Sequence, residues 1–253
     1  MLPLPEIKGI QTMREKDLPI DLTKHKVYSK NAKKCVLKLL HRYHDEKTSA
    51  DLWEKVQLKY CEFLKDEPAL AGSKITVSIY DPILIFAWYA VAPDKPAIEE
   101  VQQDVYDCFM GSFDLLGRIF NLNRKADNRL AARIFRKTSE IRKEEIRKYP
   151  ASFRMGGFDY DRENGVVRYS FTQCPNAEFA KRHHMEDVLP VMCNCDHLAM
   201  QKLHAALIRE GTCCTAVCCD YCIVGDRNPL AEEYELQKTD NGLWVSVKNE
   251  VRT

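Results

Sequence analysis

The sequence predicts an α+β protein. A mainly helical N-terminal region, residues 1–150, is followed by a C-terminal region, residues 151–253, in which an antiparallel sheet packs with helices. Two observations predict this class. Before Pro150, apolar residues recur every three to four positions, as on one face of a helix. After it, they alternate on both sides of a Glu-Asn-Gly turn at 163–165, as in a β-hairpin. Whether the two regions form one integrated domain stays open.

In the first region, apolar spacing predicts two helices within residues 29–66, with Ser49 or Asp51 as the N-cap of the second. Residues 74–82 alternate with period two, which predicts either a strand or the approach to a buried helix over 82–91.

Two further helices are predicted over residues 97–120 and 126–148. The second is heavily charged, with Glu and Lys or Arg four positions apart. That pattern is typical of a solvated helix face rather than of a nucleic-acid surface.

The second region mixes both periods. The predicted elements are a hairpin over 156–173, helices over 175–184 and 186–209, a strand-like stretch over 211–226 and a last strand over 242–249.

The composition excludes several classes of partner. With 45% hydrophobic residues the chain can bury a sizeable core, and its formal charge of +1 gives no field that would attract nucleic acid or an anionic membrane. The longest apolar run, 82–93, is too short to span a bilayer, and the N-terminus lacks the features of a secretory signal. We therefore expect a cytoplasmic protein that acts on a small molecule, with a homo-oligomer as an open alternative.

The cysteines are unevenly placed, since eight of the eleven lie between residues 174 and 222. An odd number in a chain expected to be cytoplasmic argues against a disulfide framework. Cys35, Cys61 and Cys108 lie on predicted helices and are expected to be small core residues.

The local context of some clustered cysteines suggests chemistry. Cys174 precedes Pro175, a residue favoured at the first position of a helix, so we expect Cys174 at the N-cap with its thiol pKa lowered by the helix amides. A buried packing cysteine is the alternative. Cys193, Asp196 and His197 would share one helix face and could supply a nucleophile, a carboxylate and a base, although His197 is equally well explained as a surface or core histidine.

The C-terminal region resembles the L-2-amino-thiazoline-4-carboxylic acid hydrolase family between about residues 150 and 226. The stretch "FDYDRENGVVRYSFTQCPNAEFAKRHHMEDVLPVMCNCDHLAMQKL" followed by "CCDYCIVGD" carries the resemblance. Its landmarks are Thr-x-Cys-Pro at the end of a strand, Glu-Phe on the next helix, Leu-Pro before Cys193, Asp196 three residues later, and Cys-Asp-Tyr in a strand. The chain departs from the family in its additional cysteines and in lacking a glycine-rich turn within 201–212.

The resemblance implies hydrolytic opening of a 2-amino-thiazoline ring that carries a carboxylate, giving a carbamoyl-cysteine. Such a reaction requires a nucleophile, an acidic partner for the amidine nitrogens and a cation for the carboxylate. The catalytic candidates are Cys174, Cys193, Cys219, Asp196 and Asp220, and the substrate-binding candidates are Arg168, Phe171, Glu178, Phe179, His197 and Tyr221. Arg154 is a second candidate for gripping the carboxylate, and a surface ion pair is the alternative for either arginine.

No cofactor is predicted, but zinc is an alternative. Thiolates could hold zinc if the chain brought together four of Cys193, Cys195, Cys214, Cys218, Cys219 and Cys222. That arrangement would suit a metal-dependent hydrolase of a related cyclic amidine or amide. It would also suit a non-catalytic module similar to the 4-vinyl reductase domains, which bind small ligands. The adjacent His183 and His184 diverge by ~100° on a helix and are poorly placed to share an ion.

Overall fold

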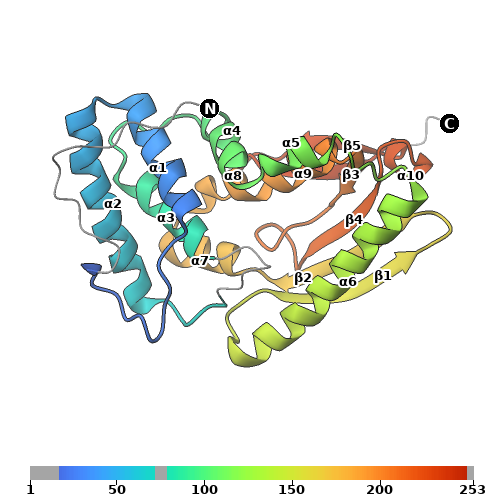
Figure 1. Ribbon diagram of the computed structural model, residues 1–253, viewed down its shortest axis with the longest axis horizontal. Coiled ribbons are helices and arrows are strands. Elements are labelled where there is room, and N and C mark those ends of the chain that lie inside the picture. Colours follow the sequence, from blue (N-terminus) through green and yellow to red (C-terminus); the bar gives the residue numbers. More distant parts are fainter. Residues whose placement is uncertain (1–16, 72–78, 250–253) are drawn as a thin grey trace.

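The computed structural model describes residues 17–71 and 79–249 and shows the predicted α+β class (Figure 1). The N-terminal helices gather at one end of the molecule, and a four-stranded antiparallel sheet lies at the other end with further helices packed along it. The helices are α1 Lys30–Tyr43, α2 Glu46–Asp66, α3 Tyr80–Val91, α4 Ile98–Phe109, α5 Ser112–Leu116, α6 Lys125–Lys148, α7 Pro175–His183, α8 Pro190–Cys193, α9 Cys195–Lys202 and α10 Pro229–Glu232. The strands are β1 Arg154–Asp161, β2 Val166–Gln173, β3 Ala205–Ile208, β4 Cys219–Gly225, β5 Tyr234–Lys238 and β6 Trp244–Lys248.

The first two helices lie where the apolar spacing predicts them, but the N-cap prediction for α2 is wrong. Asp45 is the N-cap, and its carboxylate accepts the N–H of Thr48 at 2.8 Å. A capping side chain must stand just outside the first turn, whereas Ser49 and Asp51 lie inside the helix.

Helix α3 is buried on every side and confirms the predicted buried helix, while the strand considered over 74–82 falls largely on residues 72–78, which lie outside the described residues. The helix predicted over 97–120 is two helices, α4 and α5, which are separated at Met110 and Gly111. Helix α5 ends at Gly117, where a Cβ atom would lie 1.9 Å from the carbonyl oxygen of Lys202. Only glycine allows the chain to pass α9 this closely.

The four-stranded sheet has the order β1-β2-β4-β3, and each neighbouring pair is antiparallel. The β1–β2 hairpin is confirmed, with Gly165 at φ 66° in its turn. The helix predicted over 186–209 is instead a 3-10 turn at Glu186–Val188 followed by the separate helices α8 and α9, and the prediction is wrong beyond Leu203. Residues 205–208 form β3 because their backbone pairs with β4 along the sheet edge.

The strand-like stretch 211–226 also needs correction, since only Cys219–Gly225 is a strand and 211–218 is a loop closed by a tight turn at Thr212. The predicted last strand is β6, which pairs with β5 in a separate two-stranded sheet.

One large apolar core continues from the N-terminal helices into the C-terminal region. Phe179 of α7 illustrates this continuity, because its ring packs 5.1 Å from Phe63 of α2 and 5.0 Å from Phe86 of α3. Helix α6 contacts β1 and sends Phe135 against Tyr169, so it covers part of one face of the sheet. None of the helices in the described ranges is long and apolar enough to cross a membrane.

Candidate functional site

The pairing of β2 with β4 divides the candidate residues between two faces of the sheet. Tyr169 pairs with Tyr221 and Phe171 with Cys219, and these side chains face the helices. Alternation turns Arg168, Asp220 and Cys222 to the opposite face, towards α10 and β5. We call the first face the inner face and the second the outer face.

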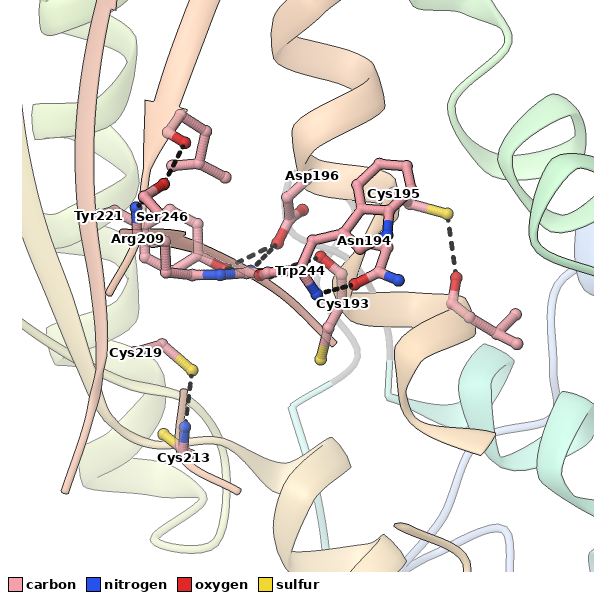
Figure 2. A network of polar contacts seen from close by, with 12 residues as sticks. Cys193, Asn194, Cys195, Asp196, Arg209, Cys213, Cys219, Tyr221, Trp244 and Ser246 are labelled. Atoms are coloured by element: carbon pink, nitrogen blue, oxygen red, sulfur yellow. Dashed lines mark hydrogen bonds and ion pairs between the residues drawn. The ribbon is translucent and has the colours of Figure 1, made fainter. Parts of the chain in front are cut away.

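A buried arginine organises the inner face (Figure 2). Arg209, 1% exposed, follows β3, and its guanidinium donates to the Asp196 carboxylate and the Tyr221 hydroxyl, both at 3.4 Å. It also donates to the carbonyls of Cys193 at 3.1 Å and Trp244 at 3.3 Å. The Tyr221 hydroxyl donates to the same Asp196 oxygen at 2.7 Å. One guanidinium therefore connects α8, α9, β4 and β6.

Backbone contacts of neighbouring residues fix the network in place. Arg209 exchanges hydrogen bonds with Ser246 of β6, from its own N–H to the hydroxyl at 3.0 Å and from the Ser246 N–H to its carbonyl at 2.7 Å. Asn194, buried between Cys193 and Cys195, accepts the Trp244 N–H at 2.9 Å and donates to Gln102 of α4 at 2.9 Å. The junction of α8 and α9, which carries Cys193 and Asp196, is thus held from two sides.

Asp196 combines a desolvated position with partial access. Burial raises the pKa of its carboxyl group, while the Arg209 charge and the Tyr221 hydroxyl act in the opposite direction. Yet 33% of the Asp196 side chain remains accessible. Part of the Asp196 side chain is therefore open to solvent, although burial disfavours the charged form of its carboxyl group.

Cys174 is the N-cap of α7 with Pro175 after it, as predicted, but its thiol is not activated in the expected way. Burial raises the thiol pKa to about 12, and this outweighs the lowering by the amides of Ala177 and Asn176. Burial also raises the pKa of Cys193, against the lowering effect of Arg209. Charge on Cys174 or Asp196 would raise the pKa of Cys193 further.

A second thiol pair lies at the edge of the inner face. The Cys213 N–H donates to the Cys219 sulfur at 3.0 Å, and the Cys213 thiol donates to the carbonyl of Phe171 at 3.2 Å. The pKa of Cys213 is lowered to about 7, chiefly by the hydrogen bond from the Cys219 thiol, and Lys181 acts in the same direction. The pKa of Cys219 is raised by the same hydrogen bond.

The remaining predicted site residues lie elsewhere. Phe179 is a fully buried core residue, and Glu178 beside it is exposed. Arg154 is exposed at the start of β1. Asp220 accepts the N–H groups of Glu210 and Gly211, at 3.0 and 2.6 Å, and so holds the start of the 211–218 loop on the outer face.

His197 lies beside the network but is not placed as a general base. It is 3% exposed, its ring packs against Trp244, and burial lowers its pKa to about 3. Its Nε2 has no hydrogen-bond partner within the described residues.

Residues 17–71 and 79–249 contain no group of three or more His, Cys, Asp or Glu side chains arranged to hold a metal ion. Of the six cysteines considered for zinc, two point away from the others. The Cys195 thiol donates to the carbonyl of Val191 at 3.0 Å, and Cys222 faces outward.

Sequence reasoning missed Arg209 and Cys213. The predicted helix over 186–209 ends at Arg209, although "AALIR" at 205–209 places this residue two positions from Leu207, on the same side of a strand. Cys213 was one of several adjacent cysteines, and no spacing distinguishes it.

The chain was compared with protein-family models, with curated proteins and with solved structures. No match was found in any of the three comparisons. The inner-face site must therefore be interpreted from its own chemistry.

Proposed function

We propose that this protein is a hydrolase that opens a small cyclic amidine such as 2-amino-thiazoline-4-carboxylate, and that the reaction takes place at the inner face. The observation that carries the proposal is Asp196. Its side chain is desolvated but one-third accessible, its carboxylate is oriented by Tyr221 and Arg209, and Cys193 lies three positions earlier, at the end of α8.

The charge of the site favours an amidine. A carboxylate that is poorly hydrated is stabilised by a cation with N–H donors. A protonated amidine presents two such N–H donors in one plane. Arg209 already donates to Cys193, Trp244, Tyr221 and Asp196, so it orients the carboxylate and is not free to leave it. The rings of Phe171 and Tyr221, which meet edge to face with centroids 5.6 Å apart, add apolar surface to the inner face.

The same cation would activate the thiol. In the free protein Cys193 is neutral because burial raises its pKa. An amidinium bound to Asp196 brings positive charge beside the thiol and stabilises the thiolate. Asp196, whose own pKa is raised, is suited to take the thiol proton and to return it to the leaving group.

The steps balance with one water. The Cys193 thiolate attacks the amidine carbon, the ring C–S bond breaks, and the ring sulfur receives the proton held by Asp196. Water then adds to the isothiourea carbon, and the Cys193 thiol leaves with a proton from that water. The product is a carbamoyl-cysteine, one water heavier than the substrate.

The test is a mass-spectrometric assay of the purified, reduced protein with 2-amino-thiazoline-4-carboxylate. We expect wild type to form the product heavier by one water, and Cys193→Ser and Asp196→Asn to lose at least about 100-fold in rate. Cys222→Ser is the matched control, because Cys222 lies on the outer face one residue after Tyr221.

The substrate recovered unchanged from wild type would contradict the proposal. Saturable binding without product would instead favour a ligand-binding module. Metal analysis of the same samples adds an independent check, since activity that follows zinc content and survives in Cys193→Ser would favour a metal-dependent hydrolase.

A further inference from the structure

Helices α1 and α4 pack against each other in an antiparallel register that brings two thiols together. Tyr43, at the end of α1, donates to Glu100, in the first turn of α4, at 3.3 Å. Further back on α1, the ammonium group of Lys38 lies 2.9 Å from the Asp104 carboxylate. Partners therefore advance along α4 as the chain is followed backwards along α1. Cys35 lies one turn before Lys38 on the same face, and this register places it opposite the last turn of α4.

Cys108 lies in that last turn, and its thiol forms a hydrogen bond with the Cys35 thiol. The Cys35 sulfur lies 3.9 Å from the carbonyl oxygen of Asp104, which is one turn before Cys108 on the same face of α4. The hydrogen bond between the thiols lowers the pKa of Cys108 and raises the pKa of Cys35. The shared proton therefore stays on Cys35, and Cys108 is the sulfur that more readily becomes a thiolate.

The two thiols differ in exposure and in their charged neighbours. The sequence predicts a core position for both, and Cys35 is 0% exposed, whereas Cys108 packs against the core but remains partly exposed. The positive charge of Lys38 also lowers the pKa of Cys108, while burial and the carboxylates of Asp104 and Asp107 act in the opposite direction. Cys108 is therefore the thiol that is open to a small reagent in solvent, and Cys35 lies behind it as a second sulfur.

We propose that Cys108 and Cys35 form a redox modification site, at which a hydroperoxide converts the two thiols into a disulfide that links α1 to α4. The geometry divides the roles. The partly exposed Cys108 reacts with the peroxide, and the buried Cys35 resolves the product because it already lies against the Cys108 sulfur. The site uses no residue of the proposed hydrolase reaction, so the two proposals are tested separately.

The two steps balance with hydrogen peroxide as the oxidant. The Cys108 thiolate attacks one peroxide oxygen, the O–O bond breaks, and the products are a Cys108 sulfenic acid and, with the thiol proton, one water. The Cys35 sulfur then attacks the Cys108 sulfur, the S–O bond breaks, and the hydroxide leaves with the Cys35 proton as a second water. The two thiols together lose two hydrogens and two electrons, which reduce one hydrogen peroxide to two waters.

The experiment treats the reduced full chain with hydrogen peroxide, blocks the remaining thiols with iodoacetamide and maps the tryptic peptides by mass spectrometry without reduction. Cleavage after Lys34 and Lys38 leaves Cys35 in the peptide 35–38, and the tryptic peptide that contains Cys108 has no other cysteine. A link between these two peptides therefore identifies the disulfide without ambiguity. We expect the linked peptides to weigh two hydrogens less than the sum of the two free peptides.

Three variants separate the steps and provide the control. In Cys35→Ala the sulfenic acid of Cys108 has no partner, so dimedone should label the Cys108 peptide after peroxide treatment. Cys108→Ser should lose the link and leave Cys35 a free thiol. Cys61→Ala is the matched control, because it removes a buried thiol of α2 from the same core, and it should form the link as fully as wild type. Circular dichroism of each variant checks the fold.

Three outcomes would overturn the proposal. The first is that Cys35 and Cys108 remain free thiols in wild type at millimolar peroxide. The second is that Cys108 forms a disulfide with a different cysteine. The third is that dimedone labels Cys35 in Cys108→Ser as readily as it labels Cys108 in Cys35→Ala, which would refute the division of roles.

Discussion

Replacing Arg209 should destabilise the protein more than any other single change at the inner face. Arg209→Met keeps the length of the side chain but removes the charged donor from the Cys193 and Trp244 carbonyls, which lie 3.1 and 3.3 Å away. It also leaves the Asp196 carboxylate without its cation. Removing one partner of a buried ion pair costs about 3–5 kcal/mol. Because Asp196 is 33% accessible, water offsets part of this loss, and we expect a decrease of about 3 kcal/mol in the free energy of unfolding.

The matched change on the other partner should cost less. Asp196→Asn retains an oxygen that can accept from Tyr221, and Arg209 keeps its two carbonyl acceptors, so we expect a loss of about 1–2 kcal/mol. Urea unfolding of both variants and of the double variant measures the difference. The double variant should lose less than the sum of the two single variants, because the two residues interact directly.

The order of the two losses decides the interpretation. An Arg209→Met variant as stable as Asp196→Asn, or more stable, would refute the view that Arg209 links the strands and helices around the site. An additive double variant would show that the two side chains do not interact. Equal slopes of free energy against urea concentration are needed for the comparison, since a changed slope would indicate a changed unfolded or folded state.

Three further predictions concern neighbouring features. Phe179→Ala should lower the free energy of unfolding by about 3–5 kcal/mol, because the ring is fully buried. Glu178→Ala, at an exposed position, should change the free energy of unfolding by less than about 0.5 kcal/mol. Similar thermal unfolding of the two variants would contradict the assignment of Phe179 to the core. Burial lowers the pKa of His197 to about 3, below its unfolded value, so its contribution to stability is complete above about pH 6.5 and is lost as the pH falls towards about 3. As the pH is lowered across this range, the urea midpoint should therefore fall more steeply in wild type than in His197→Gln. Parallel curves of midpoint against pH would refute the lowered pKa of His197. Because the pKa of Cys213 is lowered to about 7 and that of Cys174 is raised to about 12, a small alkylating reagent at neutral pH should modify Cys213 before Cys174. Peptide mapping that finds the reverse order would contradict this prediction.

Features that depend on neighbouring residues could be predicted from the sequence. The charged helix α6, the β1–β2 hairpin around Gly165 and the N-cap position of Cys174 each follow from residues within a few positions of one another. Alternation along β4 also indicates that Cys219 and Asp220 face opposite sides, whatever the surroundings.

The sequence by itself thus determined the α+β class, most of the elements and the separation of Cys219 from Asp220. Only the tertiary structure decided which of these two residues faces the helices, that residues 205–208 pair with β4 instead of extending a helix, and that Arg209 therefore reaches Asp196. It also raises the pKa of the Cys174 thiol, which the sequence predicts to be lowered, because the effect of burial outweighs that of the helix amides. The physical reason is the same in each case. Strand pairing and desolvation depend on groups far apart in the chain, and the local pattern of residues carries no record of them.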